Sequence, residues 1–160
     1  MSIPIEQRAK KIKCVIFDVD GVLTDGKLYF SDKGDTMKTF NTQDGLGILM
    51  LKNVGIDIAI ITGRTSTMVE LRAQALGISH LYQGYVNKVD AFEHCLKTLR
   101  LTSDDIAYMG DDINDLPLMR KVALSVAPPN ANDNVLKEAH WITRRAGGDG
   151  AARELCELIL

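Results

Sequence analysis

The amino-acid sequence predicts an α/β fold, a doubly wound Rossmann-like parallel sheet with helices on both faces. One observation predicts this fold class, and a second predicts the number of domains. Short apolar runs of strand length alternate with segments whose apolar residues recur every three or four positions. This alternation is typical of parallel strands joined by helical crossovers and buried on both faces. The chain also has 160 residues and is 46% hydrophobic, which is enough for one ordinary core, so we expect a single domain over residues 1–160.

The expected strands lie at Cys14–Phe17, Ile56–Ile61, His80–Tyr82, Ile106–Met109, Ala123–Val126 and Trp141–Ile142. Helical periodicity lies between them, at Gly45–Lys52, Met68–Leu76, Val89–Leu99 and Leu116–Lys121. Gly55 and Gly77 follow two of these segments and predict where those helices end. Near the end of the chain, residues 152–159 carry a further helical apolar stripe, which we expect to pack in the core or an interface.

One segment, about residues 26–41, breaks the alternation. Lys27–Ser31 and Met37–Phe40 flank the turn-forming run Asp32-Lys33-Gly34-Asp35, which is typical of a hairpin. We therefore expect a short β-hairpin flap directly after the first strand, where it could overhang the end of that strand.

The bulk composition excludes several classes of partner. The formal net charge of −2 favours neither nucleic acid nor an anionic membrane surface. No apolar run approaches the length of a membrane span, and residues 1–13 lack the apolar core of a signal peptide. Cys14, Cys95 and Cys156 are far apart and without metal-site spacing, so we expect buried thiols in a reducing cytoplasm.

Two carboxylates, Asp18 and Asp20, end the first expected strand. Residues two apart in a strand point to the same side, so both acids enter one small space. Like charges that close repel each other, and one acid resists ionising unless a cation is present. Open α/β sheets also place their chemistry at the carboxyl ends of strands. An N-cap or Asx turn explains one such acid more readily than two.

The pair indicates metal-assisted phosphoryl transfer. In this interpretation Asp18 attacks phosphorus and forms an aspartyl-phosphate. Asp20 protonates the leaving alkoxide and then takes a proton from the hydrolytic water. Gly21 allows a tight bend, so that backbone N–H groups can face phosphate oxygens.

A second acidic cluster, residues 110–115, follows the expected strand at Ile106–Met109. Mg²⁺ prefers oxygen ligands, and Asp18, the backbone carbonyl of Asp20 and Asp111 would suffice on the protein side. Asp112 and Asp115 are expected beside these ligands, with Asp115 alternatively reaching the ion through water. The helix macrodipole explains one acid at a helix start but not three. Calcium is less favoured, because the EF-hand spacing is absent.

Two more positions after expected strands carry side chains that suit phosphoryl transfer. The hydroxyl of Thr62 could hold a phosphoryl oxygen, and Lys88, at the start of a helix, could neutralise charge on Asp18 and the transferring group. Each residue alone is common in positions without function. Their value lies in the order along the chain: acid pair, threonine, lysine and acid cluster at consecutive strand ends.

This set resembles the four motifs of the haloacid dehalogenase superfamily of phosphatases, and the flap resembles that of the cap-less subclass. Three further runs, at Phe40–Ile48, Ile60–Arg64 and Ala146–Glu154, are similar to the 3-deoxy-D-manno-octulosonate 8-phosphate phosphatases of lipopolysaccharide biosynthesis. The resemblance implies an Mg²⁺-dependent homotetramer whose flaps pack at the centre. It also implies that each active site lies at a subunit boundary.

The resemblance also implies roles for individual residues around a small anionic sugar phosphate. Metal ligands would come from Asp18, Asp111 and the carbonyl of Asp20. Substrate contacts would come from Asp20, Asn41, Thr42, Gln43, Asp44, Gly45, Arg64, Arg72 and Lys88. Independently of the family, a sugar acid phosphate carries a carboxylate, which arginine binds well, and Arg64 and Arg72 fit that need.

The chain departs from the family pattern in two places. The family often has basic residues where this chain has Gln43 and Leu49, which leaves less positive charge near the substrate carboxylate. Family chains also usually run beyond the position of Leu160, so we expect a shorter lid over a neighbouring site. Arg144 and Arg145 are candidate anion contacts in the glycine-rich approach to that segment.

Three alternatives stay open at this point. The first is the same chemistry on a nine-carbon acid sugar 9-phosphate. Arg64 favours the eight-carbon substrate over this one. The second is a phosphoacceptor receiver module, which the order of motifs disfavours, because Asp111 and Asp112 follow Thr62 and Lys88. The third is a relative that binds ligand without catalysis, which the full set of reactive side chains disfavours.

Overall fold

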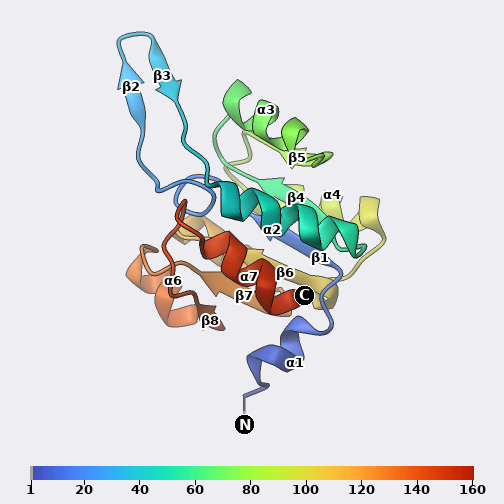
Figure 1. Cartoon of the computed structure of the whole chain (residues 1–160). Coiled ribbons are helices and arrows are strands. Elements are labelled where there is room, and N and C mark those ends of the chain that lie inside the picture. The colour runs from blue at the N-terminus through green and yellow to red at the C-terminus, as the bar shows by residue number, and fades with distance from the viewer. Residues whose placement is uncertain (1) are drawn as a thin grey trace.

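The computed structural model describes residues 2–160 and is built on a six-stranded sheet (Figure 1). Its strand order is β5-β4-β1-β6-β7-β8, and every neighbouring pair is parallel. The strands are β1 (Cys14–Phe17), β4 (Asp57–Ile61), β5 (His80–Tyr82), β6 (Ile106–Met109), β7 (Leu124–Ala127) and β8 (Trp141–Ile142). This confirms the predicted α/β class.

Strand β1 lies at the point where the direction of the chain through the sheet reverses. From β1 the chain proceeds to β4 and β5 on one side, and then returns to add β6, β7 and β8 on the other. Ligand sites in open α/β sheets lie at such a switch point, outside the carboxyl ends of the strands. The topology therefore directs attention to the loops after β1, β4 and β6.

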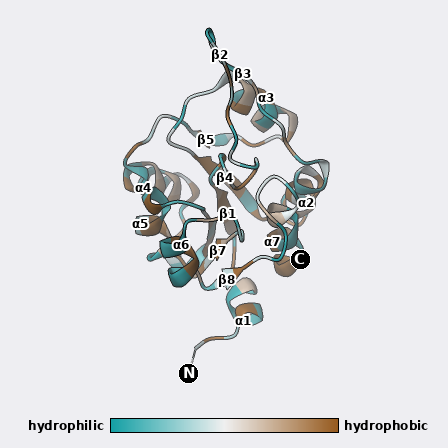
Figure 2. Ribbon diagram, turned by 90° about the vertical axis from the view of Figure 1, so that its left-hand side faces the viewer, coloured by the Kyte–Doolittle hydropathy of each residue, from teal (hydrophilic) through white to brown (hydrophobic). Residues whose placement is uncertain are grey.

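Helices cover both faces of the sheet, which Figure 2 shows edge-on. One face packs against α1 (Ile5–Ala9), α2 (Thr42–Asn53), α3 (Thr67–Ala75) and α7 (Ala151–Ile159). The other packs against α4 (Lys88–Leu99), α5 (Leu116–Met119) and α6 (Asp133–Glu138). Side chains of β1 alternate between the two cores, with Val15 and Phe17 in the first and Cys14 and Ile16 in the second. All three cysteines are buried and unpaired, as predicted.

Helix α2 begins earlier than its apolar periodicity indicates. Asn41 caps it, because its Oδ1 accepts the backbone N–H groups of Gln43 and Asp44 at 2.8 and 3.2 Å. The short helices α1 and α6 were not predicted, since neither is long enough to show a full apolar period. Among the residues that the structure describes, no helix combines the length and apolar character needed to span a bilayer.

The predicted flap is present as an antiparallel hairpin, but its second strand was placed too late. The hairpin consists of β2 (Tyr29–Ser31) and β3 (Gly34–Met37), with Ser31 opposite Gly34. Gly34 has a φ of +97°, which lets the chain turn within two residues instead of the four expected. Residues 38–40 therefore belong to the return path toward the sheet. The hairpin projects from the carboxyl end of β1 (Figure 1).

Candidate active site

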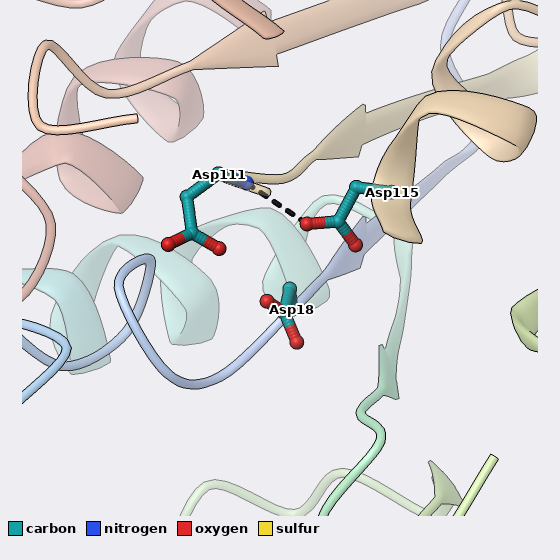
Figure 3. A group of neighbouring side chains, drawn as sticks. All are labelled: Asp18, Asp111 and Asp115. Carbon is teal, nitrogen blue, oxygen red and sulfur yellow. Dashed lines mark hydrogen bonds between the residues drawn. The ribbon is translucent and has the colours of Figure 1, made fainter. Parts of the chain in front are cut away.

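Three carboxylates converge where β1 and β6 end side by side. Asp18 follows β1, while Asp111 and Asp115 follow β6, and one oxygen from each lies within 4.8 Å of the others (Figure 3). Parallel strands bring their carboxyl ends to one edge, and Phe17 pairs in register with Met109. Asp18 and Asp111 are more than 90 positions apart in the sequence, and the fold thus joins their segments into one acidic centre.

Asp115 is the fixed member of this centre. Its side chain is fully buried, and Oδ1 accepts hydrogen bonds from Lys88 Nζ at 2.6 Å and from the Tyr108 hydroxyl at 2.5 Å. Oδ2 accepts the backbone N–H groups of Asp111 and Asp112 at 2.9 and 3.1 Å. Because both oxygens are occupied by donors, Asp115 is suited to hold the loop and Lys88 in place rather than to bind an ion directly.

Lys88 bridges the two acidic segments from the start of α4. Its ammonium lies 3.0 Å from Asp18 Oδ1, and its side chain is 1% exposed. Burial alone would lower the pKa of Lys88, but the charges of Asp18 and Asp115 prevail and raise it. Lys88 therefore remains a cation next to the carboxylate of Asp18.

The electrostatics of the centre favour a bound cation. Burial, together with the charge of Asp115, raises the pKa of Asp18 to about 6, although Lys88 opposes the shift. Burial and the charge of Asp18 raise the pKa of Asp111 to about 8. One lysine thus does not compensate the charge of three carboxylates, and a divalent cation on Asp18 and Asp111 would supply the missing positive charge. The oxygen-only donor set fits Mg²⁺.

The backbone at Gly21 is shaped by the same centre. Gly21 has a φ of +88°, and a Cβ at this position would lie 1.9 Å from Asp111 Oδ2. Only glycine gives both the left-handed conformation and the space for this carboxylate. The bend after Asp20 predicted from the sequence is therefore present, and it brings the loop after β1 against the Asp111 side chain.

A cavity of about 240 Å³ opens over the acidic centre. It is lined by Asp18, Asp20, Gly26, Thr62, Gly63, Arg64, Asp111, Asp112 and Asn114. Thr62 follows β4 and is held there by a backbone hydrogen bond to Tyr82. The structure thus brings together the acid pair, the threonine, the second acidic cluster and Arg64. Lys88 does not line the cavity but is buried in contact with Asp18 and Asp115.

Two ion pairs connect the flap to this cavity, and neither was predicted. Lys38 Nζ lies 2.7 Å from Asp20 Oδ1, and Arg64 Nη2 lies 2.8 Å from Asp35 Oδ2. The contact with Asp35 is the largest of the influences that raise the pKa of Arg64. Both Asp20 and Arg64 are therefore held by flap residues on the wall of the cavity.

The remaining predicted substrate residues lie elsewhere. Asn41, Thr42, Gln43, Asp44, Gly45 and Arg72 do not line the cavity of Asp18. Arg72 instead donates to the carbonyl of Asn41 at 3.2 Å and lies 5.5 Å from the centre of the Phe40 ring. These residues gather at the start of α2 and beside α3.

The start of α2 is tied to the C-terminal segment. Asp44 is buried, and its Oδ1 accepts the backbone N–H of Arg153 at 2.9 Å. Burial raises the pKa of Asp44. Gln43 Oε1 accepts a hydrogen bond from Arg145 Nη1 at 2.5 Å, at the edge of a cavity of about 500 Å³. Asp44 therefore acts here as a packing and hydrogen-bonding residue of this chain.

Sequence reasoning missed Lys38, Tyr108 and Asn130, which position parts of the site. Asn130 donates to the carbonyl of Gly21 at 2.9 Å and accepts the N–H of Gly147 at 2.7 Å, which joins two loops. Its contact depends on a residue 109 positions away. No local spacing signals such partners.

The comparisons with known proteins agree with this geometry. A family model described as a haloacid dehalogenase-like hydrolase matches residues 77–155. The 3-deoxy-D-manno-octulosonate 8-phosphate phosphatase of Yersinia pestis is 49% identical, over 96% of this chain and 82% of the relative. Among solved structures, the enzyme of the same name from Moraxella catarrhalis, in complex with magnesium, phosphate and KDO, is 45% identical with a TM-score of 0.94. That match covers 98% of this chain and 90% of the other.

A second structure extends the comparison to another metal. It is the cobalt-bound deoxy-D-mannose-octulosonate 8-phosphate phosphatase of Haemophilus influenzae, which is 38% identical with a TM-score of 0.94, over 96% of this chain and 90% of the other. This similarity over nearly the whole chain favours a phosphatase over a receiver module. The chain belongs to the haloacid dehalogenase-like hydrolases and, within them, to the family of 3-deoxy-D-manno-octulosonate 8-phosphate phosphatases.

Proposed function

We propose that this chain hydrolyses 3-deoxy-D-manno-octulosonate 8-phosphate to the free sugar acid and phosphate, through an aspartyl-phosphate on Asp18. The observation that carries the proposal is the convergence of Asp18, Asp111 and Lys88 at the carboxyl ends of β1 and β6. Curated relatives that are 46–49% identical to this chain, over 82–85% of their own length, carry the name of that activity. The product would serve lipopolysaccharide biosynthesis.

In the first half-reaction, an oxygen of Asp18 forms a bond to phosphorus while the bond from phosphorus to the sugar oxygen breaks. Asp20 gives its proton to that departing oxygen. Lys88, 3.0 Å from Asp18, reduces the negative charge that the incoming phosphoryl group meets. The hydroxyl of Thr62 lies on the cavity wall, where it can donate to a phosphoryl oxygen.

In the second half-reaction, water attacks the phosphorus of the aspartyl-phosphate, and Asp20, now a carboxylate, accepts the proton. Asp18 is released as a carboxylate and phosphate leaves. Asp18, Asp111 and the carbonyl of Asp20 would hold Mg²⁺, which supplies charge neutralisation and orientation of the phosphoryl group when bound. Asp112 and Asp115 support these residues. Asp112 accepts the backbone N–H of Ile113, and Asp115 accepts a hydrogen bond from Lys88.

Arg64 is the residue of this chain best placed to meet the sugar acid, because it lies on the wall of the same cavity. Its guanidinium is paired with Asp35, a carboxylate that a substrate carboxylate could replace. Roles in substrate binding for Asn41, Thr42, Gln43, Asp44, Gly45 and Arg72 stay predictions from the family resemblance. Of these, Thr42 and Gln43 are exposed and could meet substrate across a subunit boundary, whereas Asp44 and Gly45 are buried within this chain.

A homotetramer whose flaps pack together is part of the proposal. Leu28, Phe30 and Met37 of the flap are 47, 69 and 50% exposed. A neighbouring copy of the chain would bury these side chains and exclude water from the site. A single domain and a cytoplasmic location likewise stay predictions.

Phosphate release from a panel of sugar acid phosphates, with Mg²⁺ and with excess chelator, tests the function. We expect the eight-carbon 8-phosphate to give the highest kcat/KM, and chelator to abolish turnover. The nine-carbon acid sugar 9-phosphate is the competing substrate. Arg64→Ala should reduce discrimination between the two, while Arg120→Ala, which removes a surface pair with Glu138, should leave it unchanged.

A quench experiment tests the intermediate. We expect a hydroxylamine-sensitive phosphate on Asp18 in quenched mixtures, and oxygen from labelled water in the released phosphate. Preference for the nine-carbon substrate would change the assigned substrate and leave the chemistry intact. Absence of the covalent phosphate would exclude Asp18 as nucleophile.

A further inference from the structure

One lysine of the flap has an unusual position for its charge. The side chain of Lys38 is 4% exposed, whereas Lys27 and Lys33 in the same segment are exposed. Burying an ammonium group is costly unless it is paired with an opposite charge. The partner is Asp20, whose Oδ1 lies 2.7 Å from Lys38 Nζ. The flap therefore places a buried cation on the carboxylate assigned to proton transfer.

The course of the chain explains how Lys38 reaches this position. The hairpin makes a two-residue turn, so β3 ends at Met37 and Lys38 begins the return path to α2. Asn41 then fixes the start of α2, and Phe40 packs against the core of the sheet. Lys38 thus lies between a hairpin strand and an anchored helix start, which holds its side chain toward the loop after β1.

Asp20 depends on this contact. Within residues 2–160, the bond from Lys38 is the one side-chain hydrogen bond that the Asp20 carboxylate makes. Its side chain is 21% exposed and lines the cavity. A carboxylate without another partner rotates among several orientations, whereas proton transfer needs one oxygen within hydrogen-bond reach of the reacting group.

We propose that Lys38 is a positioning residue for the acid and base of the reaction. Lys38 binds Oδ1 and leaves Oδ2 to exchange the proton. As the bond from phosphorus to the leaving oxygen breaks, the proton moves from Oδ2 to that oxygen, and the ammonium of Lys38 stabilises the carboxylate that remains. Oδ2 then takes a proton from the attacking water. This inference rests on the role assigned to Asp20 under the proposed function.

Two other roles for Lys38 make different predictions. A lysine that binds the phosphoryl group directly would assist every phosphate ester equally. A lysine that only anchors the flap would lower the amount of folded enzyme, which also affects all substrates equally. Positioning of Asp20 matters most where the leaving group needs a proton, and least where it departs as a stable anion.

The test is a leaving-group series. Values of kcat/KM are measured for the octulosonate 8-phosphate, for phenyl phosphate and for nitrophenyl phosphate, because kcat/KM reports the step in which the leaving group departs. The variants are K38M, K38Q, D20N and, as a matched control at an exposed lysine of the adjoining hairpin, K33M. K38Q keeps most of the side-chain length, so the result does not depend on a single variant folding.

We expect D20N to lose about 100-fold or more on the sugar phosphate and far less on nitrophenyl phosphate. K38M and K38Q should lose about tenfold on the sugar phosphate and less than about twofold on nitrophenyl phosphate, with phenyl phosphate between them. K33M should match the wild type on all three. The ratio between substrates is independent of the folded fraction.

The outcomes separate the two proposals. If K38M and K38Q lose activity equally on all substrates, or not at all, while D20N remains selective, the inference on Lys38 is overturned and the function stands. If D20N itself shows no dependence on the leaving group, the role of Asp20 fails, and that of Lys38 fails with it.

Discussion

The acidic centre and the flap lie at the same edge of the sheet but are stabilised in opposite ways. In the centre, Asp115 and Lys88 are buried, and both have charged or hydrogen-bonding partners from other elements. In the flap, Leu28, Phe30 and Met37 are exposed, and two ion pairs connect the hairpin to the cavity. One chain thus fixes its reactive groups by its own packing and leaves its flap surface uncovered.

This difference has a thermodynamic counterpart. A buried charge pair such as Lys88 and Asp115 loses several kcal/mol of stability when one member is removed, because the other remains buried without its partner. An exposed side chain on a hairpin changes stability by about 0.5 kcal/mol or less. Variants of the buried pair Asp115 and Lys88 should therefore affect folding as well as chemistry, and variants of the exposed apolar residues of the flap should affect assembly and water exclusion.

The largest expected effect is on catalysis. Asp18→Asn should lower kcat by about 10⁴-fold or more, because an amide is not a nucleophile toward phosphorus and the covalent route is lost. The fold should persist, since the variant removes one of three mutually repelling charges. Steady-state turnover and thermal unfolding of the same preparation check both statements. Activity within tenfold of the wild type would remove Asp18 from the role of nucleophile.

The next effect is on folding. Asp115→Asn should lower the free energy of unfolding by about 3 kcal/mol, because the amide has no charge to pair with Lys88 and only one acceptor oxygen. Its NH2 group would therefore face other donors, either Lys88 and Tyr108 or the backbone N–H groups of Asp111 and Asp112. Urea unfolding measures the change. Asp104→Asn, at an exposed acid near the opposite end of β6, is the control and should stay within about 0.5 kcal/mol. Equal effects of the two variants would contradict the central position of Asp115.

A smaller effect concerns pH and metal. Because the pKa values of Asp18 and Asp111 are raised to about 6 and about 8, the folded chain binds more protons than the unfolded chain above pH of about 4. Stability without metal should therefore fall as pH rises from about 4 to about 8. Mg²⁺ must displace these protons at low pH, so its stabilising effect should grow over the same range.

Thermal unfolding with Mg²⁺ and with chelator, at pH 6 and pH 8, measures this. The difference between the two midpoints should be larger at pH 8. A difference that is equal or larger at pH 6 would show that the metal does not bind to the pair Asp18 and Asp111.

The smallest effect on the isolated chain is expected in the flap. Phe30→Ser should change the free energy of unfolding by about 0.5 kcal/mol or less, but it should weaken assembly, because Phe30 is 69% exposed on the proposed contact surface. Leu71→Ser, at a 65% exposed residue of α3, is the matched control. Mass in solution by light scattering reports the result. Loss of assembly in both variants, or in neither, would contradict packing through the flap.

Local patterns in the sequence determined the main architecture and the reactive groups. Strand-length apolar runs followed by Asp18, Thr62 and Asp111 were sufficient, because the carboxyl ends of parallel strands must share one edge of the sheet. The cap of α2 at Asn41 and the two-residue turn at Gly34 were readable in principle, since both depend on neighbouring residues. Short helices such as α1 and α6 could not be predicted from the sequence, because one or two helical turns are too short to show an apolar period.

Tertiary structure alone decided which partner each reactive group has. Asp115 occupies both oxygens with donors from three segments, Lys38 reaches Asp20 across 18 positions, and Arg72 turns to Asn41 across 31 positions. Helical and strand periodicities govern contacts over a few residues, whereas these contacts depend on how whole elements pack. The sequence by itself determined the chemistry available at this edge, and packing determined which oxygen, nitrogen and proton face one another.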